Sequence, residues 1–213
     1  MSFRPPRQQP LRILGPAGAL ELLLEDPHAD AADTGSRPGF AVVCHPHPLY
    51  GGTMTNKVVH MVARSLQEQG LATLRFNYRG VGQSEGSYDE GRGETADALA
   101  VIAWGRERWP QAPLTLAGFS FGSMVALMAA PLAEPIRLIT VAPAVSNLGY
   151  AAIQQPRCPW LIIQGEADEL VDYRAVIEFA GHFSPPPALR LFPGVDHFFN
   201  GHMPELREAV LQG

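Results

Sequence analysis

Residues 114–128 read LTLAGFSFGSMVALM, with apolar runs on both sides of the segment Gly118-Phe119-Ser120-Phe121-Gly122. The residues before this segment predict a strand that ends at Ala117, and those after it predict a helix over Phe121–Ala133. A sharp strand–turn–helix connection makes a serine hydroxyl project from the edge of a sheet. Glycine two residues before and after the serine removes side chains that would collide in such a turn. The segment therefore predicts a nucleophilic Ser120; the alternative is a glycine-rich turn with a serine that has no chemical role.

Outward from this segment, short β-prone runs alternate with stretches of helical periodicity along the whole chain. This alternation predicts an α/β fold with a mostly parallel sheet and helices on both faces. No repeat or boundary interrupts the pattern, so we expect residues 1–213 to form a single domain. The expected strands are Leu11–Leu14, Leu20–Glu25, Phe40–Cys44, Leu71–Phe76, Pro113–Ala117, Ile136–Ala142, Trp160–Gln164 and Ala188–Phe192; the expected helices lie within Thr53–Gln69, Glu94–Trp109, Phe121–Ala133, Tyr173–Phe183 and Pro204–Leu211.

Composition excludes several functional classes. The chain has 16 Lys and Arg against 21 Asp and Glu, a formal net charge of −5, and no basic block that would favour nucleic-acid binding. The longest apolar region, 121–145, is interrupted by prolines and charges, so we expect no membrane span. Cys44 and Cys158 are too few for a disulfide scaffold. With no convincing secretion signal at the N-terminus, we expect a cytoplasmic protein with two free thiols.

A serine nucleophile needs a general base, and the base needs an acid that orients it. Because ligands bind at the carboxyl ends of parallel strands, these partners are expected just after other strands of the sheet. His197 directly follows the last predicted strand, and it is therefore the predicted base. The loop after the preceding strand reads GEADELV (165–171), in which Asp168 is the predicted acid. Glu166 and Glu169 remain alternatives for that role.

Attack of a serine on an ester carbonyl creates an oxyanion that backbone N–H groups must hold. One donor is expected at Phe121, the residue after the nucleophile. The second is expected in the loop HPHPLYGG (45–52). The prolines of that loop have no N–H, so His47 is the first choice, with Leu49 or Tyr50 as alternatives.

Two other ligand sites deserve comparison with this prediction. His45, His47 and His60 are an alternative set of metal ligands, but no spaced carboxylate or cysteine set completes the site. The glycine-rich residues 80–86 resemble a dinucleotide-binding loop without its spacing and without a helix that begins at once. We therefore expect neither a metal nor a cofactor.

Taken together, the motifs resemble those of the α/β-hydrolase superfamily, and most of all its compact bacterial members. The resemblance implies an eight-stranded, mostly parallel sheet in which only the second strand is reversed. The link 143–159 is too short for the helical cap that many relatives carry, so no cap domain is expected. One departure is His45-Pro46, where many relatives have His-Gly. The segments that carry the resemblance are HPHPLYGG (45–52), NYRGVGQSEG (77–86), GFSFG (118–122), GEADELV (165–171) and DHFF (196–199).

The resemblance and the residues together imply a serine hydrolase that cleaves carboxylic esters of short or medium acyl length. Its partner would be a small ester, and the sequence leaves the oligomeric state open. Leu49, Tyr50, Phe119 and Phe198 are expected to line a shallow substrate groove, with packing in the core as the alternative. A thioesterase or peptidase with the same triad, and a non-catalytic binding module on the same fold, remain alternative functions.

Overall fold

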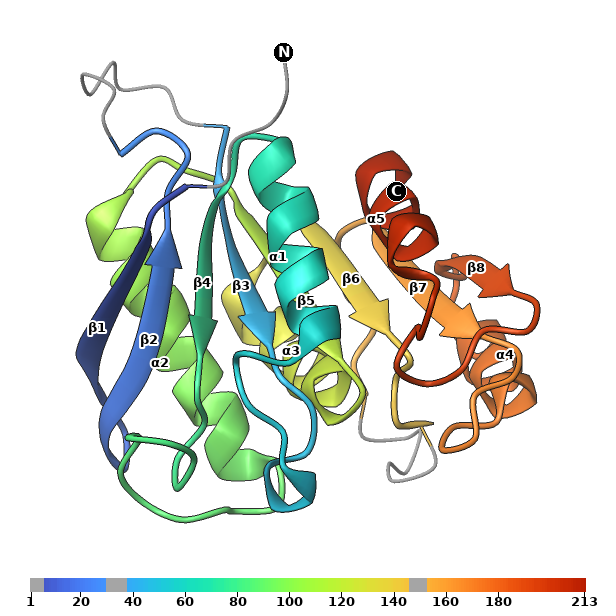
Figure 1. Cartoon of the computed structure of the whole chain (residues 1–213), viewed down its shortest axis with the longest axis horizontal. Helices are drawn as coiled ribbons and strands as arrows, with labels where there is room; N and C mark the ends of the chain where they lie inside the picture. Colours follow the sequence, from blue (N-terminus) through green and yellow to red (C-terminus); the bar gives the residue numbers. More distant parts are fainter. Residues whose placement is uncertain (1–5, 30–37, 146–152) are drawn as a thin grey trace.

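The computed structural model describes residues 6–29, 38–145 and 153–213 (Figure 1). No helix within these ranges is long and apolar enough to cross a membrane. The strands are β1 (Gln8–Gly15), β2 (Gly18–Glu25), β3 (Phe40–Cys44), β4 (Ala72–Phe76), β5 (Leu114–Phe119), β6 (Arg137–Val141), β7 (Trp160–Gly165) and β8 (Ala188–Phe192). The helices are α1 (Lys57–Glu68), α2 (Arg92–Arg108), α3 (Phe121–Ala133), α4 (Tyr173–Gly181) and α5 (Met203–Gln212), and Pro48–Tyr50 form a short 3-10 turn, η1.

All eight strands join in one sheet in the order β1-β2-β4-β3-β5-β6-β7-β8. β2 pairs antiparallel with β1 and β4, and every other neighbouring pair is parallel. This confirms the predicted sheet with only the second strand reversed. Because β3 to β8 run in one direction, the loops that follow them gather at one edge of the sheet (Figure 1).

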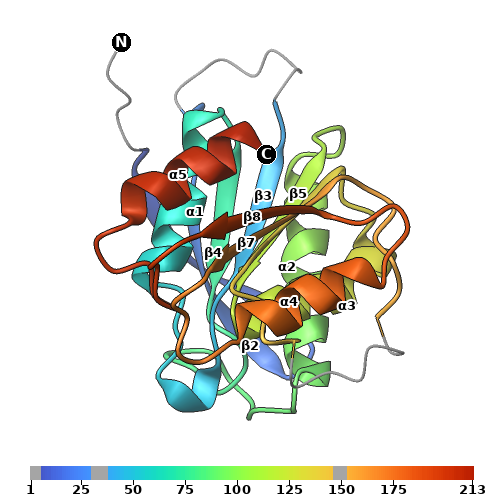
Figure 2. The same ribbon diagram turned by 90° about the vertical axis from the view of Figure 1, so that its right-hand side faces the viewer.

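Helices cover both faces of the sheet, as predicted. α1 and α5 lie on one face, and α2, α3 and α4 lie on the other (Figure 2). The core on the α1/α5 side includes Val59, Val62 and Leu206, all without exposed surface. The core on the α2/α3/α4 side includes Val101 and Phe179. The central strands β3 and β5 are buried along their whole length, which explains why their sequences are continuous apolar runs.

Helix starts are fixed by side chains that accept backbone N–H groups. α1 begins at Lys57, later than the expected Thr53, because the Asn56 carboxamide oxygen accepts the N–H of Val58 at 2.9 Å. α2 begins two residues before the expected Glu94. The fully buried Glu94 carboxylate accepts the N–H of Gly91 at 2.7 Å and so anchors the loop that enters this helix.

The buried Asp97 and the half-buried Glu21 also hold the loop between β4 and α2. Arg79 Nη2 lies 2.8 Å from Asp97 Oδ1, and the backbone N–H of Arg79 donates to Asp97 Oδ2 at 2.9 Å. Glu21 Oε2 accepts the N–H of Gln83 at 3.0 Å and the side-chain amide of Asn77 at 2.7 Å. A carboxylate therefore occupies the glycine-rich loop, where a nucleotide phosphate would meet like charge.

Candidate active site

Ser120 occupies the tight turn between β5 and α3 with positive φ, at φ 55° and ψ −120°. Its N–H donates to Val141 O at 2.8 Å, which ties the turn to the end of β6. A Cβ atom on Gly118 would lie 2.1 Å from Gly122 O, and one on Gly122 would lie 2.3 Å from Cys44 O. Only glycine fits at these two positions, so the GFSFG spacing follows directly from the packing of the turn.

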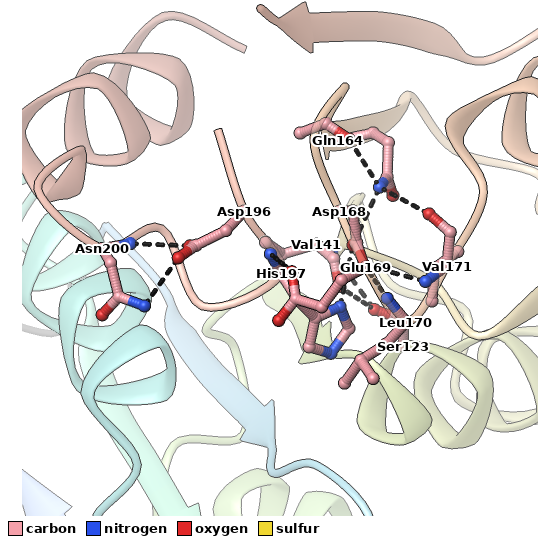
Figure 3. Close-up of polar contacts among 11 residues, drawn as sticks. Ser123, Val141, Gln164, Asp168, Glu169, Leu170, Val171, Asp196, His197 and Asn200 are labelled. Carbon is pink, nitrogen blue, oxygen red and sulfur yellow. Dashed lines mark hydrogen bonds and ion pairs between the residues drawn. The ribbon is translucent and has the colours of Figure 1, made fainter. Parts of the chain in front are cut away.

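The fully buried Ser123, in the first turn of α3, connects this helix to the ends of β5 and β6 through hydrogen bonds (Figure 3). Its hydroxyl oxygen lies 2.8 Å from Gly118 O and 2.9 Å from Val141 O, and it accepts the N–H of Val141 at 3.1 Å. The hydroxyl thus connects β5, β6 and α3 around Ser120. The sequence analysis did not single out Ser123, because a serine in an apolar helix gives no signal of this role.

Asp168 and His197 meet through their side chains at the same edge of the sheet (Figure 3). Asp168 Oδ2 accepts a hydrogen bond from His197 Nδ1 at 2.8 Å and another from Gln164 Nε2 at 2.9 Å. Oδ1 accepts the backbone N–H groups of Leu170 at 2.9 Å and Val171 at 2.8 Å. Burial raises the pKa of Asp168, but His197 and the two backbone donors outweigh burial, and the net pKa lies below the ordinary value. The side chain is therefore held as a carboxylate.

The two alternative acids take other positions. Glu169 Oε2 accepts the backbone N–H of His197 at 3.2 Å, so it contacts the main chain and not the imidazole. The half-buried Glu166 makes no side-chain hydrogen bond with the described residues. Of the three carboxylates in the loop, Asp168 is the one that binds the ring.

The His197 ring reaches the immediate neighbour of Ser120. It lies 5.0 Å from the ring of Phe119 and 5.0 Å from that of Phe198, measured between centroids. Its side chain is only 2% exposed. Since Nδ1 donates to Asp168, Nε2 carries the lone pair of the neutral ring. The Ser120 hydroxyl makes no hydrogen bond with the described residues.

The loop after β3 presents one of the three suggested oxyanion donors. The N–H of Leu49 donates to His47 Nδ1 at 3.2 Å, and the N–H of Tyr50 donates to His47 O at 3.2 Å. Both groups are used inside η1. Across the described ranges, the N–H groups of His47 and Phe121 have no protein acceptor. These two donors remain available to a ligand.

His45 and Cys44 lie beneath this loop and are fully buried. His45 Nδ1 donates to Pro46 O at 2.7 Å, and Nε2 accepts the N–H of Tyr78 at 3.2 Å. Burial lowers the pKa of His45 to about 3, and burial raises the pKa of the free thiol of Cys44 to about 12. Both ring nitrogens of His45 are occupied, so this histidine serves as a neutral bridge between the loops after β3 and β4, with neither nitrogen left for a metal.

The predicted groove residues divide into two groups. Leu49 and Tyr50 are well exposed, at 66% and 87%, and Phe198 is half-buried. Phe119 has no exposed surface, because its position in β5 directs the side chain into the core beneath His197. The prediction that Phe119 lines a groove was therefore wrong: this ring supports the imidazole from below.

Comparisons with known proteins agree with this geometry. The family described as "alpha/beta hydrolase fold" matches residues 42–144. A solved structure from Xanthomonas campestris, described as an α/β serine hydrolase without a lid, is 42% identical, with a TM-score of 0.90 over 100% of this chain and 95% of that one. The chain belongs to the α/β-hydrolase superfamily. This α/β hydrolase is also similar to a serine hydrolase homologue from Coxiella burnetii, at 41% identity, TM-score 0.89 and 99% of both chains. A protein of Rickettsia prowazekii is 33% identical over 84% of this hydrolase and 80% of its own length.

Proposed function

We propose that this α/β hydrolase is an esterase that cleaves small carboxylic esters through Ser120, His197 and Asp168. One observation carries the proposal. The 2.8 Å hydrogen bond from His197 Nδ1 to Asp168 lies at the sheet edge where Ser120 takes its positive-φ turn. An oriented imidazole and a serine on such a turn are the two parts that nucleophilic acyl transfer requires.

The proposed reaction proceeds in two displacements. The Ser120 hydroxyl attacks the ester carbonyl while His197 Nε2 takes its proton, and the Asp168 carboxylate stabilises the resulting imidazolium. The N–H groups of Phe121 and His47 hold the oxyanion of the tetrahedral intermediate. His197 then returns the proton to the leaving alcohol as the C–O bond breaks, which leaves an acyl-enzyme. Water repeats the sequence, releases the carboxylic acid and restores Ser120.

Hydrolysis, as opposed to acyl transfer, is favoured by the openness of the site. The described residues between β6 and β7, 142–145 and 153–159, contain no α-helix that would cover Ser120. The relative from Xanthomonas campestris is likewise described as lacking a lid. Water therefore has direct access to an acyl-enzyme, and an uncovered site gives little enclosure to a long acyl chain.

Labelling with a fluorophosphonate probe tests the proposed nucleophile. The wild-type protein should react and Ser120→Ala should not, because the probe requires an activated serine oxygen. Ser87→Ala, an exposed serine in the β4–α2 loop, is the matched control and should label like wild type. Labelling that persists in Ser120→Ala would overturn the assignment. Matched ester, thioester and amide substrates then separate an esterase from a thioesterase or peptidase.

A further inference from the structure

A cavity of about 220 Å³ is lined by Phe121, the residue that follows Ser120. α3 contributes Phe121, Met124 and Met128 to its wall, and the loops after β3 and β4 contribute His47 and Tyr88. The aromatic rings form a continuous cluster, with 4.8 Å between the centroids of His47 and Phe121 and 5.1 Å between those of His47 and Tyr88. None of the four residues from which we expected a groove lines this cavity.

The cavity and the imidazole lie on opposite sides of the nucleophile. His197 packs on Phe119, the residue before Ser120, whose side chain belongs to the core on the α1/α5 side. The cavity is walled by Phe121, the residue after Ser120, and by α3 on the other face of the sheet. In the proposed reaction the leaving alcohol must lie next to His197, which protonates it, and the carbonyl oxygen must face the N–H of Phe121. The third substituent of the carbonyl carbon is then directed toward the cavity.

We infer that this cavity is the acyl-group site and that it selects compact, uncharged acyl groups; the inference rests on the proposed function. Its size sets an upper limit. A cavity of about 150 Å³ is enough for benzene, and a water molecule takes about 30 Å³, so this one holds about seven to nine non-hydrogen atoms. That volume matches a hexanoyl or phenylacetyl group and is too small for a decanoyl chain.

The charges around the cavity favour neutral acyl groups. Glu90 lines it and no lysine or arginine does so among the described residues. Burial lowers the pKa of His47, and the negative charge of the fully buried Glu94 acts on that ring in the opposite direction. Two polar atoms of the wall pair with each other, since His47 Nε2 and the Tyr88 hydroxyl lie 3.2 Å apart. The exposed Glu90 carboxylate lies 3.7 Å from the Arg92 guanidinium, which is outside the wall. An acyl group that carries its own carboxylate, such as succinyl, would lose hydration here and find no cation in the wall to pair with.

Acyl selectivity measured on a set of p-nitrophenyl esters tests the inference. For wild type, kcat/KM should rise from acetyl to hexanoyl and phenylacetyl, and should fall for decanoyl and for monosuccinyl. Met128→Trp fills the cavity and should lower the ratio of hexanoyl to acetyl kcat/KM about tenfold, the effect of misfitting a few methylenes in an apolar pocket. Leu132→Ala, on the same helix but 72% exposed, is the matched control and should leave the ratio unchanged. Ala144→Leu narrows the cavity from the segment that follows β6 and should lower the same ratio. It replaces Met128→Trp in the test if Met128→Trp fails to fold.

The possible outcomes separate this inference from the proposed function. Normal fluorophosphonate labelling with an unchanged ratio in both filled variants would overturn the acyl site and leave the esterase intact. If wild type is neither labelled nor active, the proposed function fails. The cavity is then tested alone in Ser120→Ala by titration with 2-octanone, followed through the methyl NMR signal of Met128. A shift of that signal supports a site for neutral acyl-like ligands, and no shift overturns it.

Discussion

Asp168 is surrounded by four hydrogen-bond donors, and two of them converge on one carboxylate oxygen. The hydrogen bonds from Gln164 and from the backbone fix the orientation of the carboxylate, so that Oδ2 points toward His197. The aspartate therefore sets both the orientation of the ring and the nitrogen that carries the proton. Within the described part of the chain the buried oxygen of the Gln164 side chain has no hydrogen-bond partner, so the groups to which its nitrogen donates orient the amide.

Replacing the carboxylate by an amide tests this role at a single atom. Asp168→Asn should lower kcat by about 10³ to 10⁴, because an amide nitrogen facing the ring favours the wrong tautomer. Glu169→Gln is the matched control in the same loop and should change kcat by less than about tenfold, since Glu169 binds only the backbone of His197. Initial rates on one ester with all three proteins decide the matter, and a larger loss in Glu169→Gln would contradict the assignment.

At the scale of residues, the sequence predicted side chains that follow strands. It did not predict side chains from separate loops and helices that come together only in the folded chain. Ser120, Asp168 and His197 each come directly after a strand, so their common edge was predictable from the alternation of strands and helices. Tyr88 and Met128 lie in a loop and inside a helix, and no local pattern indicates that they share a cavity with His47. Phe119 was misjudged because proximity to the nucleophile in sequence says nothing about which face of β5 its side chain occupies.

At the scale of elements, the junction of β5 with α3 leaves no room for a side chain at its two glycines. Gly122→Ala would place a methyl group 2.3 Å from the carbonyl oxygen of Cys44, which neither backbone can relieve without moving β3 or α3. The variant should lose about 3 kcal/mol of unfolding free energy or more. Gly181→Ala, at the end of α4 with no atom within 4 Å, is the matched control and should gain about 0.4 to 1 kcal/mol. Urea unfolding of both variants gives the comparison, and equal stabilities would refute the packing explanation.

Two strands match their expected ranges at both ends for different reasons. β3 is a continuous apolar run that is buried along its whole length. β8 has no buried residue, and its ends are set by Pro187 and Pro193, which flank it. β1 begins at Gln8 instead of Leu11, because pairing with Glu25 of β2 extends an edge strand through polar residues. Such pairing is a contact between two elements and leaves no trace in the periodicity of either one.

For the whole molecule, the buried neutral His45 makes stability depend on pH. The pKa of His45 is about 3 in the folded protein and about 6.5 in an unfolded chain, so the unfolded state takes up the proton first as the pH falls. The stabilisation that comes from keeping His45 neutral is complete above the pKa of the unfolded chain, and it is lost as the pH falls toward 3. Its loss between pH 6.5 and 5 should reduce the unfolding free energy by about 2 kcal/mol. Burial lowers the pKa of His47 and His60 as well, which adds to the fall.

Urea unfolding at pH 7 and pH 5 measures this effect in wild type and His45→Asn. The difference between the two pH values should be smaller in the variant by about 2 kcal/mol. Using the difference within each protein cancels any constant loss of stability that the substitution causes. The same difference in both proteins would show that His45 does not carry the linkage.

The protonated thiol of Cys44 has a consequence for covalent inhibitors. Its sulfur lies at the same edge of the sheet as the oxygen of Ser120, the proposed nucleophile, yet with a pKa of about 12 it supplies almost no thiolate at neutral pH and is fully enclosed. Iodoacetamide or mild oxidants would therefore spare this position and modify the half-buried Cys158, which precedes β7 at the opposite end of the strands. An electrophile that stops turnover without modifying Cys158 therefore acts on a group other than a thiol, and the Ser120 hydroxyl is its proposed target.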